Sequence, residues 1–79
     1  MEHLIQGSRG NAVVTLKNIL NEIGYSLECD DNFCEATTKA IVDFQKSVSI
    51  TPDGNVGDIT WAFLLNVQEM KNRNTKQSR

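Results

Sequence analysis

The side chains of this 79-residue chain that could perform catalysis are few, and their spacing fits no nucleophile–base arrangement. The one imidazole belongs to His3, close to the N-terminus, so a serine, threonine or cysteine nucleophile has little choice of a general base. Two carboxylates can hydrolyse a glycoside, but a chain of this length has little room to form a pocket around a sugar ring. The sequence therefore predicts a protein that is not an enzyme.

The chain is also poorly supplied with metal ligands. A structural zinc site normally takes four ligands, whereas this chain offers two cysteines at an uncommon spacing and a single histidine. A group of acidic residues could attract calcium, but it lacks the ligand order and the glycine of a calcium-binding loop, so a solvated acidic loop explains it better. Its members are Glu28, Asp30, Asp31 and Glu35. We predict no metal and no cofactor.

The two cysteines, Cys29 and Cys34, flank this acidic turn with four residues between them. They could form a disulfide if the turn brings their Cα atoms within about 7 Å of each other, and such a bond would suit a secreted protein. The alternative is two free thiols, one of them buried as a small apolar side chain. Both alternatives stay open.

Charge and composition exclude several classes of partner. Residues 71–79 carry four basic side chains and no acid, whereas residues 1–70 carry four basic and ten acidic side chains. An acidic body argues against a nucleic-acid surface, and no apolar run is long enough to span a membrane. The N-terminus shows no basic segment followed by an apolar one, so no signal peptide is expected in this chain. We expect one domain over residues 1–69 and a polar, basic tail or linker over residues 70–79.

Three segments repeat apolar residues every three or four positions, which is typical of amphipathic helices. We predict helices over residues 11–24, 35–48 and 58–67, with Asn11 as the N-cap of the first and Gly24 just beyond its end. No segment alternates convincingly between apolar and polar residues, so a sheet is not expected. Three such helices can bury their apolar faces only against one another. The predicted fold is all-α, a compact three-helix bundle with loops rich in glycine and aspartate.

The loops that enter the second and third helices repeat one pattern. In "DDNFCEAT" (residues 30–37) and "DGNVGDIT" (53–60), an acid, an asparagine, an apolar residue, a second acid and a threonine recur at the same spacing. We interpret each copy as a helix entry in which a turn reverses the chain and the apolar residue, Phe33 or Val56, fills the helix junction. The second acid and the threonine would satisfy free N–H groups at the helix start.

Three ordered blocks of residues resemble one known family. They are "GSRGNAVVTLKNILNEIGY", "DDNFCEATTKAIVDFQKSVSI" and "DGNVGDITWAFLL", and the match covers about Leu4 to Leu65. Their glycines, acids and apolar residues are similar to the pattern of the small three-helix peptidoglycan-binding domains. The chain departs from that pattern at Lys17, Asp31 and Cys34, where the family usually has glutamine, glycine and glycine.

The resemblance implies a non-catalytic module that binds the peptidoglycan of the bacterial cell wall and targets an associated hydrolase to it. The expected partners are peptidoglycan and a cell-wall hydrolase, with no nucleic acid and no membrane, and the module is expected to be a monomer. Its expected location is extracellular, periplasmic or associated with the cell wall. The alternative on the same scaffold is a protein–protein interaction module, such as an accessory or inhibitor of a phage or toxin system.

A wall-binding groove needs aromatic or aliphatic walls and a few amide, hydroxyl and backbone groups. The candidate ligand-binding residues at the loop–helix junctions are Arg9, Tyr25, Asp30, Asn32, Phe33, Asn55 and Trp61. Arg9 could bind a peptide carboxylate through two hydrogen bonds, or it could be a free surface charge. Phe33 and Trp61 have the alternative of lying in the core. These alternatives stay open.

Overall fold

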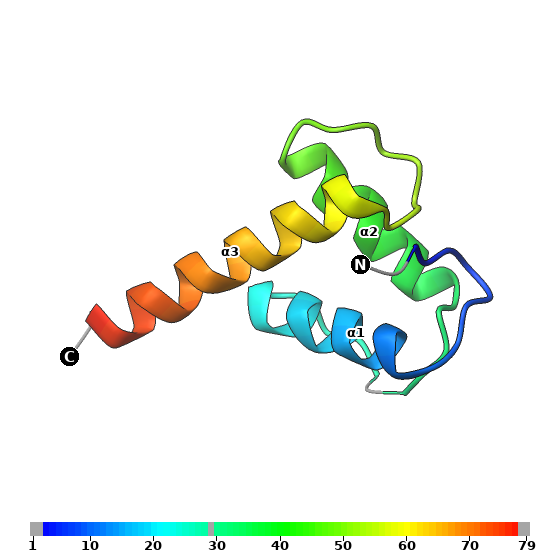
Figure 1. The fold of residues 1–79 in the computed structure, drawn as a ribbon, viewed down its shortest axis with the longest axis horizontal. Helices are drawn as coiled ribbons and strands as arrows, with labels where there is room; N and C mark the ends of the chain where they lie inside the picture. The colour runs from blue at the N-terminus through cyan, green and yellow to red at the C-terminus, as the bar shows by residue number, and fades with distance from the viewer. Residues whose placement is uncertain (1–2, 29, 78–79) are drawn as a thin grey trace.

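The structure is a computed structural model that describes residues 3–28 and 30–77, with side chains described as far as Lys71. Its helices are α1 (Asn11–Ile23), α2 (Glu35–Ser47) and α3 (Asp58–Gln77). The described ranges contain no strand, only two isolated bridges between extended residues. The predicted all-α three-helix fold is confirmed. α1 packs along α3, and the C-terminal half of α3 projects beyond the other two helices (Figure 1).

The C-terminal end of α1 forms as its sequence predicts. Gly24 follows the last helical residue with φ 138°, a conformation that glycine adopts without a Cβ clash. The N–H of Gly24 donates to the carbonyl of Asn21 at 3.2 Å, and the N–H of Tyr25 donates to the carbonyl of Leu20 at 3.0 Å. These two bonds are the Schellman arrangement, which satisfies carbonyls that the helix end would otherwise leave free.

The predicted N-cap of α1 is wrong by one residue. Gly10 occupies the N-cap position with φ 120°, and its carbonyl accepts from the N–H of Val14 at 3.3 Å. No side-chain cap bond forms, because glycine has no side chain to supply one. The positive φ explains why a glycine and not Asn11 takes this position.

α3 is ten residues longer than the predicted helix, which ended at Val67. The sequence after Gly57 contains no glycine or proline, and Gln68 to Lys71 are good helix formers that let the helix continue without an apolar face. The helix therefore runs across residue 70, where we placed the start of a tail. The boundary between a domain of residues 1–69 and a tail of residues 70–79 stays a prediction.

The N-terminal segment ties the two repeated loops together. Leu4 exchanges both backbone hydrogen bonds with Val56, at 2.9 and 2.8 Å. Farther along, the N–H of Gly7 donates to the carbonyl of Phe33 at 2.8 Å, and the N–H of Phe33 donates to the carbonyl of Ser8 at 3.0 Å. The predicted apolar residues of the two loops, Phe33 and Val56, are both fully buried. One extended segment thus fixes both helix entries against one core.

The core is built from all three helices and both loops. Its buried apolar residues are Leu4, Val13, Leu16, Ile19, Leu20, Phe33, Ala40, Ile41, Phe44, Val56, Trp61 and Leu64. Within the ranges 3–28 and 30–77, no helix combines the length and apolar character that a membrane crossing requires.

Candidate functional site

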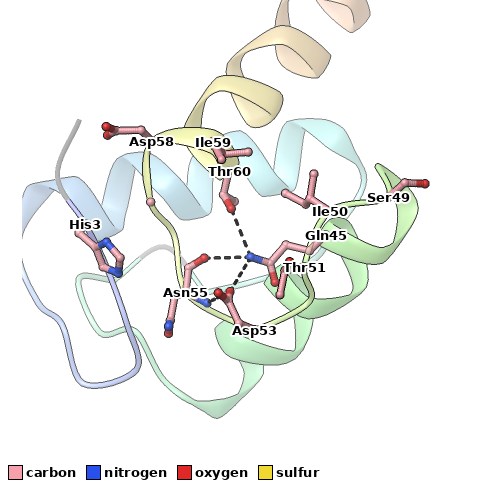
Figure 2. Close-up of a pocket in the computed structure, with 11 residues that line it drawn as sticks. His3, Gln45, Ser49, Ile50, Thr51, Asp53, Asn55, Asp58, Ile59 and Thr60 are labelled. Atoms are coloured by element: carbon pink, nitrogen blue, oxygen red, sulfur yellow. Dashed lines mark hydrogen bonds between the residues drawn. The ribbon is translucent and has the colours of Figure 1, made fainter.

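A buried glutamine at the end of α2 holds the second loop in place. Gln45 is 1% exposed, and its amide Nε2 donates to the carbonyl of Asn55 at 2.9 Å, to Asp53 Oδ1 at 3.1 Å and to Thr60 Oγ1 at 3.2 Å. Its Oε1 accepts from the N–H of Gly54 at 2.9 Å. Figure 2 shows the three bonds that Gln45 Nε2 donates. We call this set the glutamine clamp; it fixes the loop from residue 53 to residue 60.

The clamp acts on a turn that Asp53 also stabilises. Asp53 Oδ1 accepts from the N–H of Asn55 at 2.9 Å, the bond that defines an Asx turn. The pKa of Asp53 is held below its ordinary value, first by this N–H and then by the Gln45 amide. Both bonds favour the charged carboxylate, so Asp53 keeps its negative charge at neutral pH.

A pocket of about 790 Å³ opens beside the glutamine clamp. We call it the second-loop pocket. Its lining combines polar side chains, two carboxylates, one imidazole and two isoleucines (Figure 2). The lining residues are His3, Gln45, Ser49, Ile50, Thr51, Asp53, Asn55, Gly57, Asp58, Ile59 and Thr60. Apolar walls with a few fixed polar groups are the usual composition of a small-ligand site.

A lysine clamps the first loop at the equivalent place. Lys17, on α1, is 2% exposed, and its Nζ is paired with Asp30 Oδ1. Asp30 Oδ1 also accepts from the N–H of Asn32 at 3.2 Å, as Asp53 does for Asn55. The Lys17 ammonium, followed by the Asn32 N–H, lowers the pKa of Asp30. Each loop therefore contains an Asx turn of the same kind. The Gln45 amide fixes the turn in the second loop, and the Lys17–Asp30 ion pair fixes it in the first.

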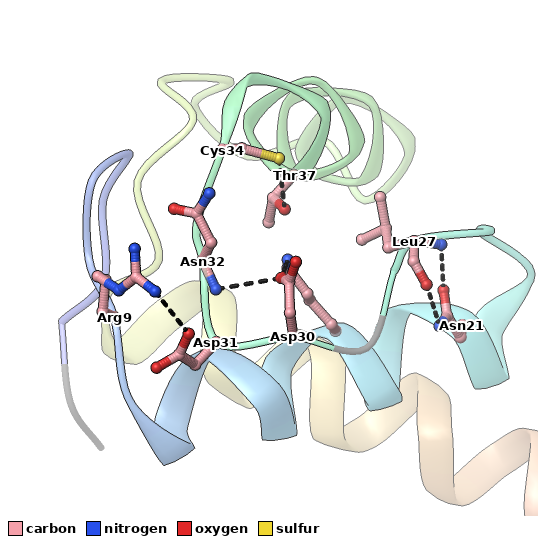
Figure 3. A network of polar contacts seen from close by, with 9 residues as sticks. Arg9, Asn21, Leu27, Asp30, Asp31, Asn32, Cys34 and Thr37 are labelled. Carbon is pink, nitrogen blue, oxygen red and sulfur yellow. Dashed lines mark hydrogen bonds and ion pairs between the residues drawn. The ribbon is translucent and has the colours of Figure 1, made fainter.

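The surface of the first loop carries a second ion pair. Arg9 Nη2 donates to Asp31 Oδ1 at 3.1 Å, and both side chains are largely exposed. Arg9 also forms a backbone bridge with Asn32. The predicted residues Asp30 and Asn32 of this loop therefore lie beside Arg9 of the N-terminal segment (Figure 3). Since exposed pairs contribute little to stability, the Arg9–Asp31 pair leaves the guanidinium able to exchange partners.

Cys34 occupies the N-cap of α2 and is half-buried. The backbone N–H groups of Thr37 and Ala36 lower the pKa of its thiol, because they stabilise the thiolate. Cys34 carries a free thiol in this structure. Cys29 lies outside the described residues, so a disulfide between the two and a pair of free thiols both stay open as alternatives.

The two loops differ in the space that they leave open. The first loop borders a cavity of only about 140 Å³, lined in part by Lys17, Leu27 and Cys34. In the second loop the position of Cys34 is held by Gly57, where an added Cβ would lie 3.5 Å from His3 Nδ1. A side chain at Gly57 would thus contact the imidazole that lines the larger pocket.

The remaining predicted site residues lie elsewhere. Tyr25 donates from its hydroxyl to Asp43 Oδ2 at 2.7 Å. Partial burial, followed by the hydrogen bond and charge of Asp43, raises the pKa of Tyr25 to about 12. Phe33 and Trp61 are 0% and 1% exposed, which is the core alternative that the sequence left open. Among the candidates, only Asn55 lines the second-loop pocket.

Several residues that build this pocket were not among the predicted site residues. Gln45 was recognised only as part of a motif, and its role depends on a loop eight to fifteen residues away. His3 reaches the pocket because the N-terminal segment pairs with Val56, a contact that carries no local sequence signal. The internal repeat was the one sequence feature that could have indicated the pocket. It marks residues 53–60 as equivalent to the loop of residues 30–37, on which three of the seven candidates were placed.

Comparison with known proteins gives one family. Residues 9–64 match the family model of the peptidoglycan binding domain. A peptidoglycan-binding protein from Clostridioides difficile is 32% identical with a TM-score of 0.78, and the match covers 80% of this chain and 40% of that one. An endolysin of the Burkholderia phage AP3 is 33% identical with a TM-score of 0.78, covering 80% of this chain and 24% of that one.

The N-terminal domain of SleB is 26% identical with a TM-score of 0.81, covering 85% of this chain and 93% of that one. This chain thus spans less than half the length of the clostridial and phage proteins, and nearly all of the SleB domain.

Proposed function

This chain belongs to the peptidoglycan binding domain family, and from that membership we propose that it is a non-catalytic module that binds bacterial cell-wall peptidoglycan. The observation that supports the proposal most is the second-loop pocket, whose fixed loop presents amide, hydroxyl and carboxylate groups beside two isoleucines. Peptidoglycan offers sugar faces, N-acetyl groups and peptide amides, which need such a mixture of apolar and hydrogen-bonding contacts.

We propose Asn55 as the principal polar contact. The Asx turn and the glutamine clamp use its backbone N–H and carbonyl, at 2.9 Å each, and neither of these bonds uses its exposed side chain. A preorganised backbone with a side chain that projects from it costs little entropy on binding. Asn32 stands at the equivalent position of the first loop and, with Arg9, is proposed as a second contact region.

The module would serve to hold a cell-wall hydrolase on its substrate. The support is that one similar structure is a phage endolysin, of which the matched region is a minor part. Tethering raises the effective concentration of an attached enzyme, so even weak binding by the module would retain it on the wall. We therefore propose the cell wall as its working location, outside the cell or in the periplasm.

The site assignment is tested by pull-down with purified sacculi, the insoluble wall sacs. Asn55→Ala and Asn32→Ala are expected to weaken binding, while the free energy of unfolding stays within about 1 kcal/mol of wild type. Asn66→Ala is the matched control, because Asn66 is exposed on α3 and lies outside the second-loop pocket. Unchanged binding in both loop variants would remove these asparagines from the site.

The same preparation of sacculi distinguishes wall binding from the alternative function. A protein–protein interaction module would leave sacculi unbound and form a defined complex with a protein partner on size-exclusion chromatography. Saturable binding to sacculi with no such complex is the result that the wall-binding proposal predicts.

A further inference from the structure

The lining of the second-loop pocket is predominantly acidic. Two of its lining residues are carboxylates, Asp53 and Asp58, and a third titratable group is the imidazole of His3. The described residues that line it include no lysine or arginine. The pKa of Asp53 is held low by hydrogen bonds from Asn55 and Gln45, so its negative charge persists. A ligand that brings a carboxylate into this pocket meets repulsion from two fixed anions.

The start of α3 lies at the same pocket, and the positive end of a helix dipole by itself favours an anion. Here Asp58 is the first residue of α3 and supplies that anion from the protein itself. The helix end is thereby partly neutralised, and it does not create a free site for a ligand carboxylate. The electrostatic potential in the pocket is therefore determined mainly by the side chains that line it.

Two apolar walls accompany the acids. Ile50 is half-buried, and Ile59 is 67% exposed although it is a large apolar side chain. In Figure 2 the isoleucines lie on one side of the glutamine clamp, and Asp53 with Asn55 lies on the other. An aliphatic chain could cover the isoleucines while a polar group at its end reaches the Asp53 carboxylate; Asp58 lies on the isoleucine side and adds negative charge at the start of α3 (Figure 2). Contact with Ile59 would remove apolar surface that is now in water.

We infer that the second-loop pocket binds a primary ammonium group carried on an aliphatic stem, such as the uncrosslinked side chain of a diamino acid in a peptidoglycan stem peptide. The inference rests on the proposed function and names the part of the wall that the pocket selects. Cross-linking converts this amine to an amide, so the module would prefer regions of the wall with free stem peptides. Glycan that has lost N-acetyl groups presents the same ammonium chemistry and is the second possible source.

Selective chemistry on the wall tests the inference. Sacculi are treated with acetic anhydride, which converts free amines to amides without cutting glycan or peptide. Binding of the wild-type chain to acetylated sacculi is expected to fall about tenfold relative to untreated sacculi. To identify the source of the amine, two competitors are used: peptide-free glycan strands that have lost N-acetyl groups, and soluble muropeptides with fully N-acetylated sugars. Competition by the muropeptides, and none by the glycan strands, is the expected result.

A charge variant tests the same point on the protein. Asp58→Asn is expected to weaken binding to untreated sacculi several-fold. Glu35→Gln is the matched control, because Glu35 is the equivalent residue in the first turn of α2 and lies outside the second-loop pocket. Thermal unfolding of both variants shows whether the fold is kept. The control is expected to bind like wild type.

The outcomes separate this inference from the function on which it rests. Equal binding to acetylated and untreated sacculi overturns the ammonium assignment and leaves wall binding standing. Competition by the glycan strands alone overturns the assignment to the stem peptide. Failure to bind any sacculi overturns both the inference and the proposed function.

Discussion

Replacing Gln45 by leucine removes the glutamine clamp while keeping a side chain of similar size. Four hydrogen bonds are lost, to the carbonyl of Asn55, Asp53 Oδ1, Thr60 Oγ1 and the N–H of Gly54. Asp53 and Asn55 are exposed residues, so water can replace the lost partner there. Gly54 and Thr60 are buried and cannot reach water without opening the loop.

The two buried groups set the size of the effect. An unsatisfied buried polar group costs about 1–3 kcal/mol, so Gln45→Leu is expected to lower the free energy of unfolding by about 2–6 kcal/mol. A domain of this length has a total stability of about 4–12 kcal/mol. The variant is therefore expected to fold poorly or to unfold at much lower urea concentration, with the loop of residues 53–60 most affected.

Urea unfolding at 25 °C, followed by far-UV circular dichroism, measures this loss. The control is Gln68→Leu, the same chemical change at a surface glutamine that makes a 3.2 Å bond to Glu22. That variant is expected to stay within about 0.5 kcal/mol of wild type. A loss below about 1 kcal/mol for Gln45→Leu, or one equal to that of the control, would refute the clamp as the element that fixes the pocket.

Four further results are expected. Asp30→Ala should destabilise the fold more than Lys17→Met, because it leaves a buried ammonium unpaired, whereas Lys17→Met leaves a half-exposed carboxylate in water. Equal losses in the free energy of unfolding, measured in urea, would contradict this. The pKa of Asp30 in the folded state is lowered from 3.8, so the stability that its carboxylate contributes is complete above that pH and is lost as the pH falls through the folded pKa. The melting temperature should therefore fall below about pH 4, and it should fall less steeply in Asp30→Asn. The raised pKa of Tyr25, about 12 against an ordinary 10.0, gives stability that is present below pH 10 and lost toward pH 12; ultraviolet titration of the phenol near pH 10 would contradict it. Gly54→Ala should lose more stability than Gly7→Ala, since both have positive φ but only the Gly54 Cβ would meet a neighbour at 3.0 Å; equal melting temperatures would contradict that.

The sequence was most informative where one short segment determines the structure. The apolar periodicity of residues 11–24 predicts a helix within one residue of its observed end at Ile23, because the buried face and Gly24 are both local features. The repeat likewise predicts that Phe33 and Val56 fill the helix junctions, and both are fully buried.

The sequence was least informative where polar side chains find partners across the fold. Lys17 lies on the buried face of α1 because Asp30, thirteen residues later, comes back to meet it. The prediction gave the repeated threonines the N–H groups at the helix start as partners, whereas the Thr60 hydroxyl accepts from Gln45 on another helix. Such pairs depend on how the helices pack, so no local pattern distinguishes them from ordinary surface groups.

The extension of α3 shows a different limit. Its residues beyond Val67 lack an apolar face, and periodicity alone therefore ends the helix there. Helix propensity and the absence of a breaker were the signals in favour of continuation, and these are weaker guides than periodicity.

The most direct test of the account is co-sedimentation of the wild-type chain with sacculi from several bacteria, over a range of protein concentrations and with an unrelated acidic protein as the control. We expect saturable binding to at least one wall type, reversed by soluble muropeptides. Addition of a reductant to a parallel series shows whether Cys29 and Cys34 contribute as a disulfide. Sedimentation no greater than that of the control protein, with every wall tested, would contradict the conclusion that this chain binds peptidoglycan.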